Sequence, residues 1–380
     1  MRLWLFLFIG LVGIGEIQAG LPLPAPARSE PEVSSPLTQD PLVRIPQSWV
    51  SWNLEWFPGR SPLASWKERK VHEEAVRGWL GRMKPVVGIF QEVLDAEAMR
   101  RAAPDLPWQA VTRFARAEDE EKNLPPQNVA ICSQVPWKEA WEVDFDRLPM
   151  TPDRPVRGFL GVEWQTQDGK RCTAYAVHLK SNRGGREAAT ARRERAMEYL
   201  RTDWERRGLD PQQDVIVIGG DFNCSLKNPE FEKERTIRRL LEEGWRSATQ
   251  ELPWPKGATV RPNLERKYPA ADFDTILLSP GWCRKYGSSR ISVRVIQDAD
   301  VPSDHWPVWF RWNEAKNRKR VGKKVSLGAF DLGYDLNGCT RSNSSDQFCR
   351  VPICQAKAPV GAGARDVLRF RSSMDSIALE

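Results

Sequence analysis

The chain has 380 residues, of which 41% are apolar and 28% are charged, and its formal net charge is +7. This composition is sufficient for a large folded core, and it excludes a collagen, a wholly disordered chain and a protein with several membrane spans. Residues 313–380 carry 12 basic and 7 acidic side chains. Most of the excess charge therefore lies in this segment and is weak evidence for a nucleic-acid partner.

Residues 1–20 have the features of an export signal. Arg2 supplies a positive charge, the apolar run Leu3–Ile14 follows it, and Ala19 is a small residue at a suitable cleavage position. The alternative is an uncleaved membrane anchor, but the run is short for a span of about 20 residues. We therefore expect a secreted or periplasmic protein with no stable membrane span after cleavage.

The next segments divide the chain into a linker, a domain and a tail. Residues 21–47 are rich in Pro, Ser, Glu and Ala without apolar periodicity, which predicts a linker. Sixteen of the 17 Trp residues lie from Trp49 to Trp312. Because large aromatic side chains dominate core packing, we expect one folded domain at residues 48–312. We also expect the protein to be a monomer. Residues 313–380 are expected to be a disordered basic tail.

Strand-like runs recur through the domain and alternate with helical segments. Too many of them are adjacent for a doubly wound sheet, so the pattern indicates a mixed α/β (α+β) fold. The runs are Ser48–Trp56, Val86–Phe90, Asn128–Ser133, Gly158–Trp164, Cys172–Leu179, Val215–Ile218, Phe273–Leu278, Arg290–Ile296 and Trp306–Trp312.

Three segments have helical patterns. Ser65 and Glu68 form a capping box, and the helix after it has one buried face, made of His72, Val76, Trp79, Leu80 and Met83. The segment Arg186–Arg207 is predicted to be a long helix with an ion-paired, exposed face that includes Arg192, Arg193, Arg195 and Arg201. Asn228 is predicted to cap a third helix, which ends at Gly244.

Acidic, amide and imidazole side chains occur where the apolar runs begin or end. These residues are Glu92, His178, Asp221, Asn223, Asp274, Asp304 and His305. A carboxylate beside a buried strand is unfavourable unless it is paired or bound to a metal. Several such residues at strand ends therefore predict a single shared site.

The residue types at these strand ends favour a hard divalent cation. Carboxylate and amide oxygens are the ligands that Mg²⁺ prefers, whereas the chain has only three His residues and no HExxH pattern for zinc. The pair Asp274 and His305 suggests an imidazole oriented by a carboxylate. His178 suits proton donation to a leaving alkoxide.

Six short motifs in this order resemble those of the endonuclease/exonuclease/phosphatase family, whose fold is that of DNase I. They are SWNLEW at Ser51–Trp56, QE at Gln91–Glu92, HLKS at His178–Ser181, GDFN at Gly220–Asn223, FDTILLS at Phe273–Ser279 and SDHWPV at Ser303–Val308. The resemblance implies a four-layer α/β/β/α sandwich with two sheets face to face. It also implies hydrolysis of phosphoesters with a divalent metal at the sheet ends.

The same resemblance implies a metal site that holds Mg²⁺, for which Mn²⁺ can substitute. Glu92 matches the principal metal ligand, with Asn53 beside it. Glu55 matches an acid that some members use for a second metal, and Asp304 matches an acid near the metal.

It also implies roles for the remaining residues. Asp221 matches the residue that orients or deprotonates the attacking water, and Asn223 matches the amide that holds it. His305 matches the His that stabilises the scissile phosphate, with Asp274 as its orienting partner. His178 matches the leaving-group His of the DNase I-like branch.

Several functions remain open at this point. We expect an exported phosphodiesterase or endonuclease of the DNase I type that acts on nucleic acid. The first alternative is cleavage of a phospholipid headgroup, as in sphingomyelinases, and the second is an inositol or sugar phosphatase. A catalytically silent binding module is the alternative outside the enzymes, and the complete set of acids, amide and imidazoles argues against it.

Overall fold

The computed structural model describes residues 28–35, 42–114, 124–167, 169–263, 269–286 and 291–312. The expected export signal and basic tail lie outside these ranges. In the part of the chain that the structure describes, no helix is both long enough and apolar enough to cross a bilayer.

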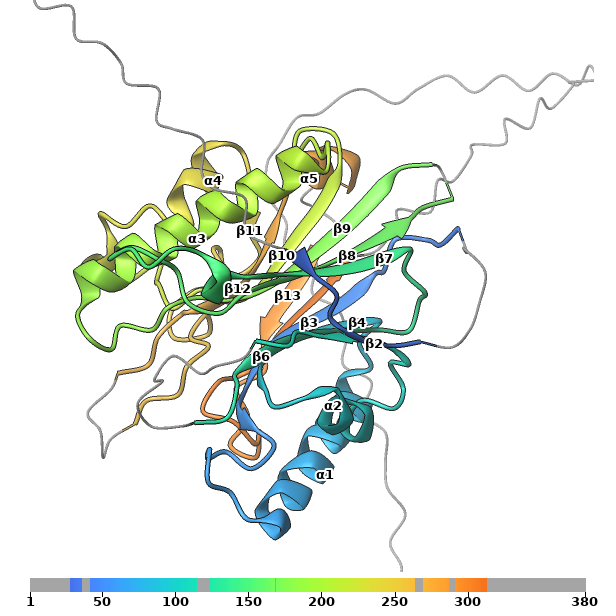
Figure 1. The fold of residues 1–380 in the computed structure, drawn as a ribbon, viewed down its shortest axis with the longest axis vertical. Helices are drawn as coiled ribbons and strands as arrows, with labels where there is room; N and C mark the ends of the chain where they lie inside the picture. The colour runs from blue at the N-terminus through green and yellow to red at the C-terminus, as the bar shows by residue number, and fades with distance from the viewer. Residues whose placement is uncertain are drawn as a thin grey trace, which may run out of the picture. The chain divides into compact units, whose positions relative to one another are not determined.

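Two seven-stranded sheets form the domain (Figure 1). The first has the order β1 (Arg28–Ser29), β7 (Glu139–Asp144), β8 (Gly158–Gln165), β9 (Arg171–His178), β10 (Val215–Asp221), β12 (Asp274–Leu278) and β11 (Arg246–Ser247). The second has the order β13 (Ile291–Val295), β14 (Val308–Trp312), β3 (Ser48–Phe57), β4 (Val87–Val93), β6 (Asn128–Ser133), β5 (Trp108–Val111) and β2 (Glu32–Ser34). The pairs β9–β10 and β3–β4 are parallel, so their carboxyl ends meet at one edge of each sheet.

Helices cover the outer face of each sheet (Figure 1). Helices α1 (Trp66–Met83) and α2 (Ala96–Ala102) pack on the second sheet, and α3 (Arg186–Arg206) and α4 (Arg238–Glu242) pack on the first. Helix α5 (Pro280–Tyr286) adds two aromatic side chains to the core between the sheets. Short 3-10 turns occupy Phe145–Arg147 and Pro229–Phe231. The arrangement is the four-layer α+β sandwich that the sequence predicts.

The core between the sheets brings strands of both layers into direct contact. Trp49 of β3 packs edge-on against Trp164 of β8, with ring centroids 5.9 Å apart. Close approach also occurs inside the first sheet at Gly220, where φ is 156° and a Cβ would collide with the carbonyl oxygen of Val177. Only glycine fits this position, which directly precedes Asp221 at the sheet edge.

The first predicted helix forms as expected, and the third does not. Ser65 Oγ accepts a hydrogen bond from Glu68 N at 3.3 Å, and Ser65 N donates to Glu68 Oε2 at 2.7 Å, which completes the capping box of α1. Asn228 caps only the turn Pro229–Phe231, and α4 begins later, at Arg238. The break contains Glu234, whose carboxylate pairs with the buried Arg193, so a tertiary contact overrides the local helix preference.

Part of the segment expected to be a linker is folded. Strand β1 pairs with β7 and strand β2 pairs with β5, so this segment adds an edge strand to each sheet. Val43 and Ile45 are buried in the core between the sheets. Main-chain pairing rather than apolar periodicity holds these two- and three-residue strands, so the sequence pattern did not reveal them.

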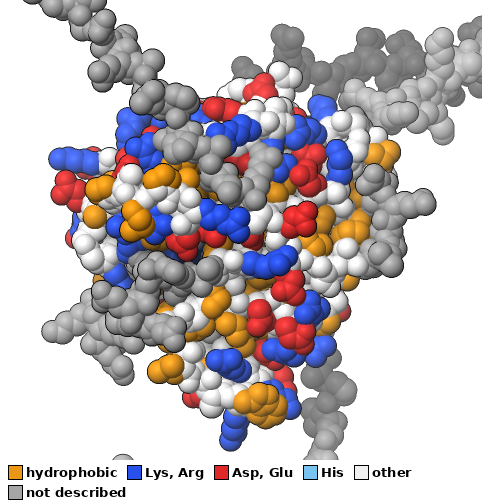
Figure 2. Space-filling model, in the orientation of Figure 1, with side chains coloured by type: hydrophobic (Ala, Val, Ile, Leu, Met, Phe, Trp, Pro, Cys, Tyr) orange, Lys and Arg blue, Asp and Glu red, His pale blue; other side chains and the backbone are white. Residues whose placement is uncertain are grey.

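The charged face of α3 is ion-paired and exposed only in part. Arg195 pairs with Glu198 and Arg201 with Glu243, and Figure 2 shows Lys and Arg side chains interspersed with Asp and Glu on one face of the molecule. Arg193, which the sequence places on the exposed face, is instead 0% exposed. It lies on the face of the helix that packs onto the sheet.

Candidate active site

All nine site residues that the sequence predicts lie together at one edge of the two sheets. A cavity of about 770 Å³ opens at this edge, beside the ends of β3, β4, β9 and β10. Seven of the nine residues line it, namely Glu55, Glu92, His178, Asp221, Asn223, Asp304 and His305. The other two, Asn53 and Asp274, are buried and hydrogen-bond to lining residues.

The main chain is irregular where it carries the acids. The register of β3 against β4 shifts between Asn53 and Phe57, and that of β4 against β6 shifts between Gln91 and Val93. Inside these bulges φ is 54° at Glu55 and 60° at Glu92. Such left-handed conformations cost about 1–3 kcal/mol each and concentrate at functional sites. A bulge changes the direction of a side chain, and here both glutamates reach the cavity.

Asn53 connects carboxylates from the two sheets. Its Nδ2 lies 3.1 Å from Glu92 Oε1 and 3.2 Å from Asp221 Oδ2. Its Oδ1 accepts a hydrogen bond from Glu55 N at 3.0 Å. The second oxygen of Glu92 accepts from Trp56 N at 2.9 Å. The amide of Asn53 therefore fixes the spacing between the acid of β4 and the acid of β10.

Three acids lie close together at the second sheet. Burial and then the charge of Asp304 raise the pKa of Glu92. The same two causes raise the pKa of Glu55, although Arg60 pairs with Glu55 Oε2 at 2.7 Å and lowers it. Mutual repulsion of this kind is relieved when a cation binds between carboxylates. The oxygen-only donor set of Glu92, Glu55 and Asp304 fits a hard divalent cation such as Mg²⁺.

Asp221 is buried and accepts hydrogen bonds on both oxygens. Asn223 N donates to its Oδ1 at 2.8 Å, and Asn223 Nδ2 donates to its Oδ2 at 3.0 Å. Burial and then the charge of Asp274 raise the pKa of Asp221 to about 7. A cavity carboxylate that titrates near neutrality is suited to accept a proton from water.

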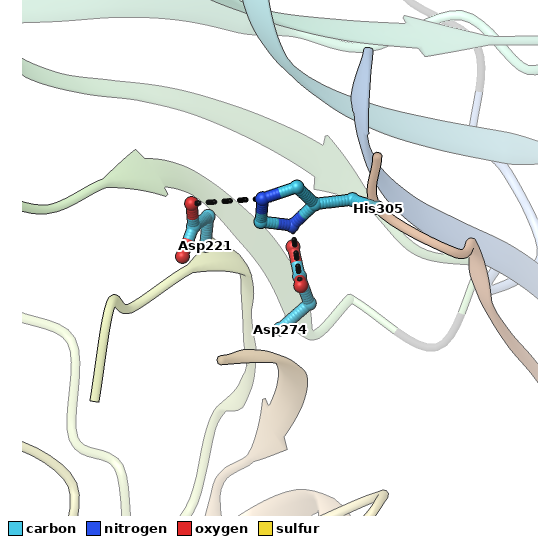
Figure 3. Close-up of side chains that lie close together, drawn as sticks. All are labelled: Asp221, Asp274 and His305. Atoms are coloured by element: carbon cyan, nitrogen blue, oxygen red, sulfur yellow. Dashed lines mark hydrogen bonds and ion pairs between the residues drawn. The ribbon is translucent and has the colours of Figure 1, made fainter. Parts of the chain in front are cut away.

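His305 lies between two carboxylates, as Figure 3 shows. Its Nδ1 is 2.8 Å from Asp274 Oδ2, and its Nε2 is 4.0 Å from Asp221 Oδ2. Burial lowers the pKa of His305, but the charges of Asp274, Asp221 and Asp304 outweigh burial and raise that pKa well above its ordinary value. The imidazole is therefore a cation at neutral pH.

Asp221, Asp274 and His305 also place one ligand atom each within 4.8 Å of the others, as in some metal sites. However, His305 Nδ1 already bonds to Asp274, and both oxygens of Asp221 accept N–H groups. We interpret this group as an acid–base unit. The all-oxygen group around Glu92 is the better fit for the metal.

His178 differs from His305 in charge. Its Nε2 lies 3.6 Å from Asp221 Oδ2 and 3.8 Å from Glu92 Oε1. Burial, and then the positive charges of Arg157 and His305, lower the pKa of His178 well below its ordinary value. The site therefore combines a neutral imidazole at position 178 with a cationic one at position 305.

Several residues near the site were not predicted to belong to it, among them Gln127, Arg157 and Arg193. Gln127 lines the cavity, while Arg157 and Arg193 are buried and donate hydrogen bonds to the main chain at the end of β9 and just after it. Gln127 and Arg157 belong to no motif. For Arg193 the helical spacing did carry a signal. It lies four residues after Ala189 and three before Ala196, and both alanines are buried, so Arg193 is on the apolar face of its helix.

Comparisons with known proteins identify the family and the fold. The model of the endonuclease/exonuclease/phosphatase family matches residues 50–305. The human Nocturnin catalytic domain is similar in structure, with 14% identity, a TM-score of 0.50 and coverage of 70% of this chain and 94% of that one. Sphingomyelinase C from Streptomyces griseocarneus has 18% identity, a TM-score of 0.49 and coverage of 71% and 100%. A family protein from Beutenbergia cavernae has 15% identity, a TM-score of 0.49 and coverage of 71% and 72%. No curated protein sequence matches the chain.

Likeness at such low identity concerns the fold alone, whereas the family match spans most of the domain and includes all nine predicted site residues, from Asn53 to His305. The fold class and the family expected from the sequence are both confirmed. Members of this family are in general phosphoester hydrolases that depend on a divalent metal. The chain belongs to the endonuclease/exonuclease/phosphatase family and has its phosphoesterase fold.

Proposed function

We propose that the protein is an exported, Mg²⁺-dependent phosphodiesterase that hydrolyses nucleic acid by in-line attack of water. One observation carries the proposal. A carboxylate with a pKa near neutrality, a cationic imidazole, a neutral imidazole and a group of three acids all meet at one cavity. Export rests on the apolar segment at residues 1–20.

In this proposal Glu92 and Asp304 hold the metal. Glu55 completes the acidic group, and Asn53 keeps Glu92 in place through its amide. When bound there, Mg²⁺ or Mn²⁺ supplies Lewis-acid stabilisation of charge on the phosphate.

Asp221 is the general base for the attacking water. Hydrogen bonds from Asn53 and Asn223 hold its carboxylate in one orientation. Its pKa of about 7 makes it a sufficiently strong base that is still largely ionised at slightly alkaline pH.

The two imidazoles have different roles in this proposal. His305, kept protonated by Asp274, donates to the phosphate, where negative charge develops. The sequence suggested His178 as a proton donor, but its lowered pKa makes the ring neutral. In this proposal Nε2, which faces the same centre, therefore donates an N–H hydrogen bond to the leaving oxygen, and solvent water protonates the alkoxide once the bond to phosphorus has broken. A leaving alkoxide, as in a nucleic-acid diester, needs this donor most.

A second candidate is cleavage of a phospholipid headgroup, and one observation favours it. Leu63 is 86% exposed and Trp66 is 76% exposed, and both lie close in sequence to Ser61 and Pro62, which line the cavity. Figure 2 shows hydrophobic side chains beside Lys and Arg at the lower end of the molecule, over α1. Exposed apolar and basic residues at one place are typical of surfaces that meet lipid.

A substrate panel with the full chain and Mg²⁺ tests these candidates. Initial rates are compared on duplex DNA, on sphingomyelin vesicles and on a sugar phosphate. The proposal predicts the highest rate on DNA, with no effect of Leu63→Ser combined with Trp66→Ser. If the highest rate were on sphingomyelin vesicles, and the Leu63→Ser, Trp66→Ser double variant reduced it, phospholipid headgroup cleavage would replace nucleic-acid hydrolysis as the function. No hydrolysis of any of these esters with either Mg²⁺ or Mn²⁺ would overturn both.

A further inference from the structure

Three consecutive carbonyl groups, of the last residue of β9 and the two residues after it, accept hydrogen bonds from two buried guanidinium groups. Arg157 Nη1 lies 3.1 Å from both His178 O and Leu179 O. Arg193 Nη1 lies 2.7 Å from Lys180 O. Arg157 is 3% exposed and Arg193 is 0% exposed. We call these two side chains and the carbonyls of residues 178–180 the guanidinium clamp.

The two arginines reach the clamp from different parts of the fold. Arg157 directly precedes β8, has φ of 66°, and donates through Nη2 to Gln127 Oε1 at 2.9 Å. A left-handed conformation at a non-glycine residue is unfavourable and persists only where the surroundings enforce it. The surrounding structure therefore fixes both the main-chain conformation of Arg157 and the position of its guanidinium group.

Arg193 comes from α3 and is neutralised by Glu234, with Nε–Oε1 and Nη2–Oε2 distances of 2.7 Å and 2.8 Å. It also donates to Asn182 Oδ1 at 3.1 Å. Burying a charged pair gives little net stability, so such a pair is a weak device for folding alone. A planar guanidinium is, however, well suited to fix several acceptors in one geometry.

No side chain among the described residues forms a hydrogen bond that orients the His178 ring. Its Nδ1 is buried and has no hydrogen-bond partner among the described residues. No second group therefore orients the ring, as Asp274 orients His305. The direction of Nε2 toward Asp221 depends on the main chain from which the side chain projects, and the clamp holds that main chain.

We propose that Arg157 and Arg193 are positioning residues, which fix the main chain at residues 178–180 and thereby hold the His178 ring at the leaving oxygen. This inference rests on the role of His178 in the proposed function.

A mutant cycle tests the positioning role. Arg157→Ala should lower kcat about 100-fold on a diester with an alkoxide leaving group and leave KM nearly unchanged. On a nitrophenyl diester, which needs no help in leaving, the rate should stay close to wild type. Arg157→Ala should add little to His178→Ala, since both remove the same contribution. Arg157→Lys should be intermediate, because an ammonium lacks the second nitrogen through which Arg157 bonds to Gln127 while Nη1 contacts both carbonyls.

Arg171→Ala is the matched control. Arg171 lies at the other end of β9 and also donates to a main-chain carbonyl, that of Arg207, at 2.7 Å. The control should retain wild-type kcat on both esters. Equal losses on both esters for Arg157→Ala, or losses that add fully to those of His178→Ala, would overturn the positioning role.

Hydrogen exchange separates this inference from the proposed function. Amides of residues 178–182 should exchange faster in Arg157→Ala than in wild type, while those of α1 keep their rates. If the wild type hydrolysed no phosphoester, the proposed function would fail, and exchange at 178–182 would still decide whether the clamp exists. Unchanged exchange in both Arg157→Ala and Arg157→Lys would contradict it. If Arg157→Ala does not fold, Arg157→Lys serves for both measurements.

Discussion

His305 Nδ1 and Asp274 Oδ2 lie 2.8 Å apart in a buried pair. The carboxylate fixes the ring and stabilises its positive charge at the place where the phosphate becomes more negative. Asp274→Asn keeps the shape but loses the charge. We expect kcat to fall on the order of 10²–10³ on alkoxide and nitrophenolate esters alike, because charge develops on the phosphate whichever group leaves. Steady-state rates on two such diesters check this, and a loss confined to one of them would contradict the assignment.

The two titrating groups predict a bell-shaped pH dependence. Asp221 must be ionised and its pKa is raised to about 7, so activity should rise with pH through that region. His305 must be protonated and its pKa is raised well above the ordinary value, so activity should fall only at clearly higher pH. A kcat/KM profile measures both limbs. In Asp274→Asn the alkaline limb should move to lower pH, and an unmoved limb would show that another group produces it.

Metal affinity should depend on Glu92. Glu92→Gln preserves size and the hydrogen bond to Asn53 but removes the charge. We expect weaker binding of Mn²⁺ in a calorimetric titration and lower activity at limiting metal, with partial recovery at high metal concentration. Glu187→Gln, an exposed change on α3, is the control and should bind like wild type. Equal affinity of Glu92→Gln and wild type would remove Glu92 from the metal site.

His72 should make stability depend on pH. Its Nδ1 accepts from Gly59 N at 2.8 Å and its Nε2 lies 2.7 Å from Pro302 O, which joins α1 to two loops beside the site. Burial lowers the pKa of His72 to about 4. The neutral His72 ring stabilises the folded state. This contribution to the free energy of unfolding is complete above about pH 6.5, the pKa of His in the unfolded chain, and is lost as the pH falls toward 4. At about 1.4 kcal/mol per pH unit, this change amounts to about 3 kcal/mol.

Urea unfolding at pH 7 and pH 4.5 measures this contribution. His72→Gln can accept from Gly59 and donate to Pro302 without gaining a proton, so it should lose less stability than wild type over this range. The same loss of unfolding free energy in both proteins would show that other groups cause the acid sensitivity.

The sequence predicted most strands, and it singled out nine residues that the structure brings to one edge of the sheets, because short polar motifs end apolar runs of clear pattern. It did not predict β7 or β5, whose patterns are weak. The contributions of Arg157 and Arg193 were also missed, since a charged residue in a polar loop or on a charged helix is usually solvated. Whether such a side chain is buried depends on carbonyl groups and on Glu234, which tertiary folding brings from elsewhere in the chain.

The most direct test of the account is the rate of hydrolysis of bis(4-nitrophenyl) phosphate by wild type and Asp221→Asn, each with Mg²⁺ or Mn²⁺ and with excess chelator. The account predicts turnover by wild type only with metal, and a loss of about 10²–10⁴-fold in Asp221→Asn. Turnover by wild type in excess chelator, or an unchanged rate in Asp221→Asn, would contradict the claim that this cavity is a metal-dependent phosphodiesterase site.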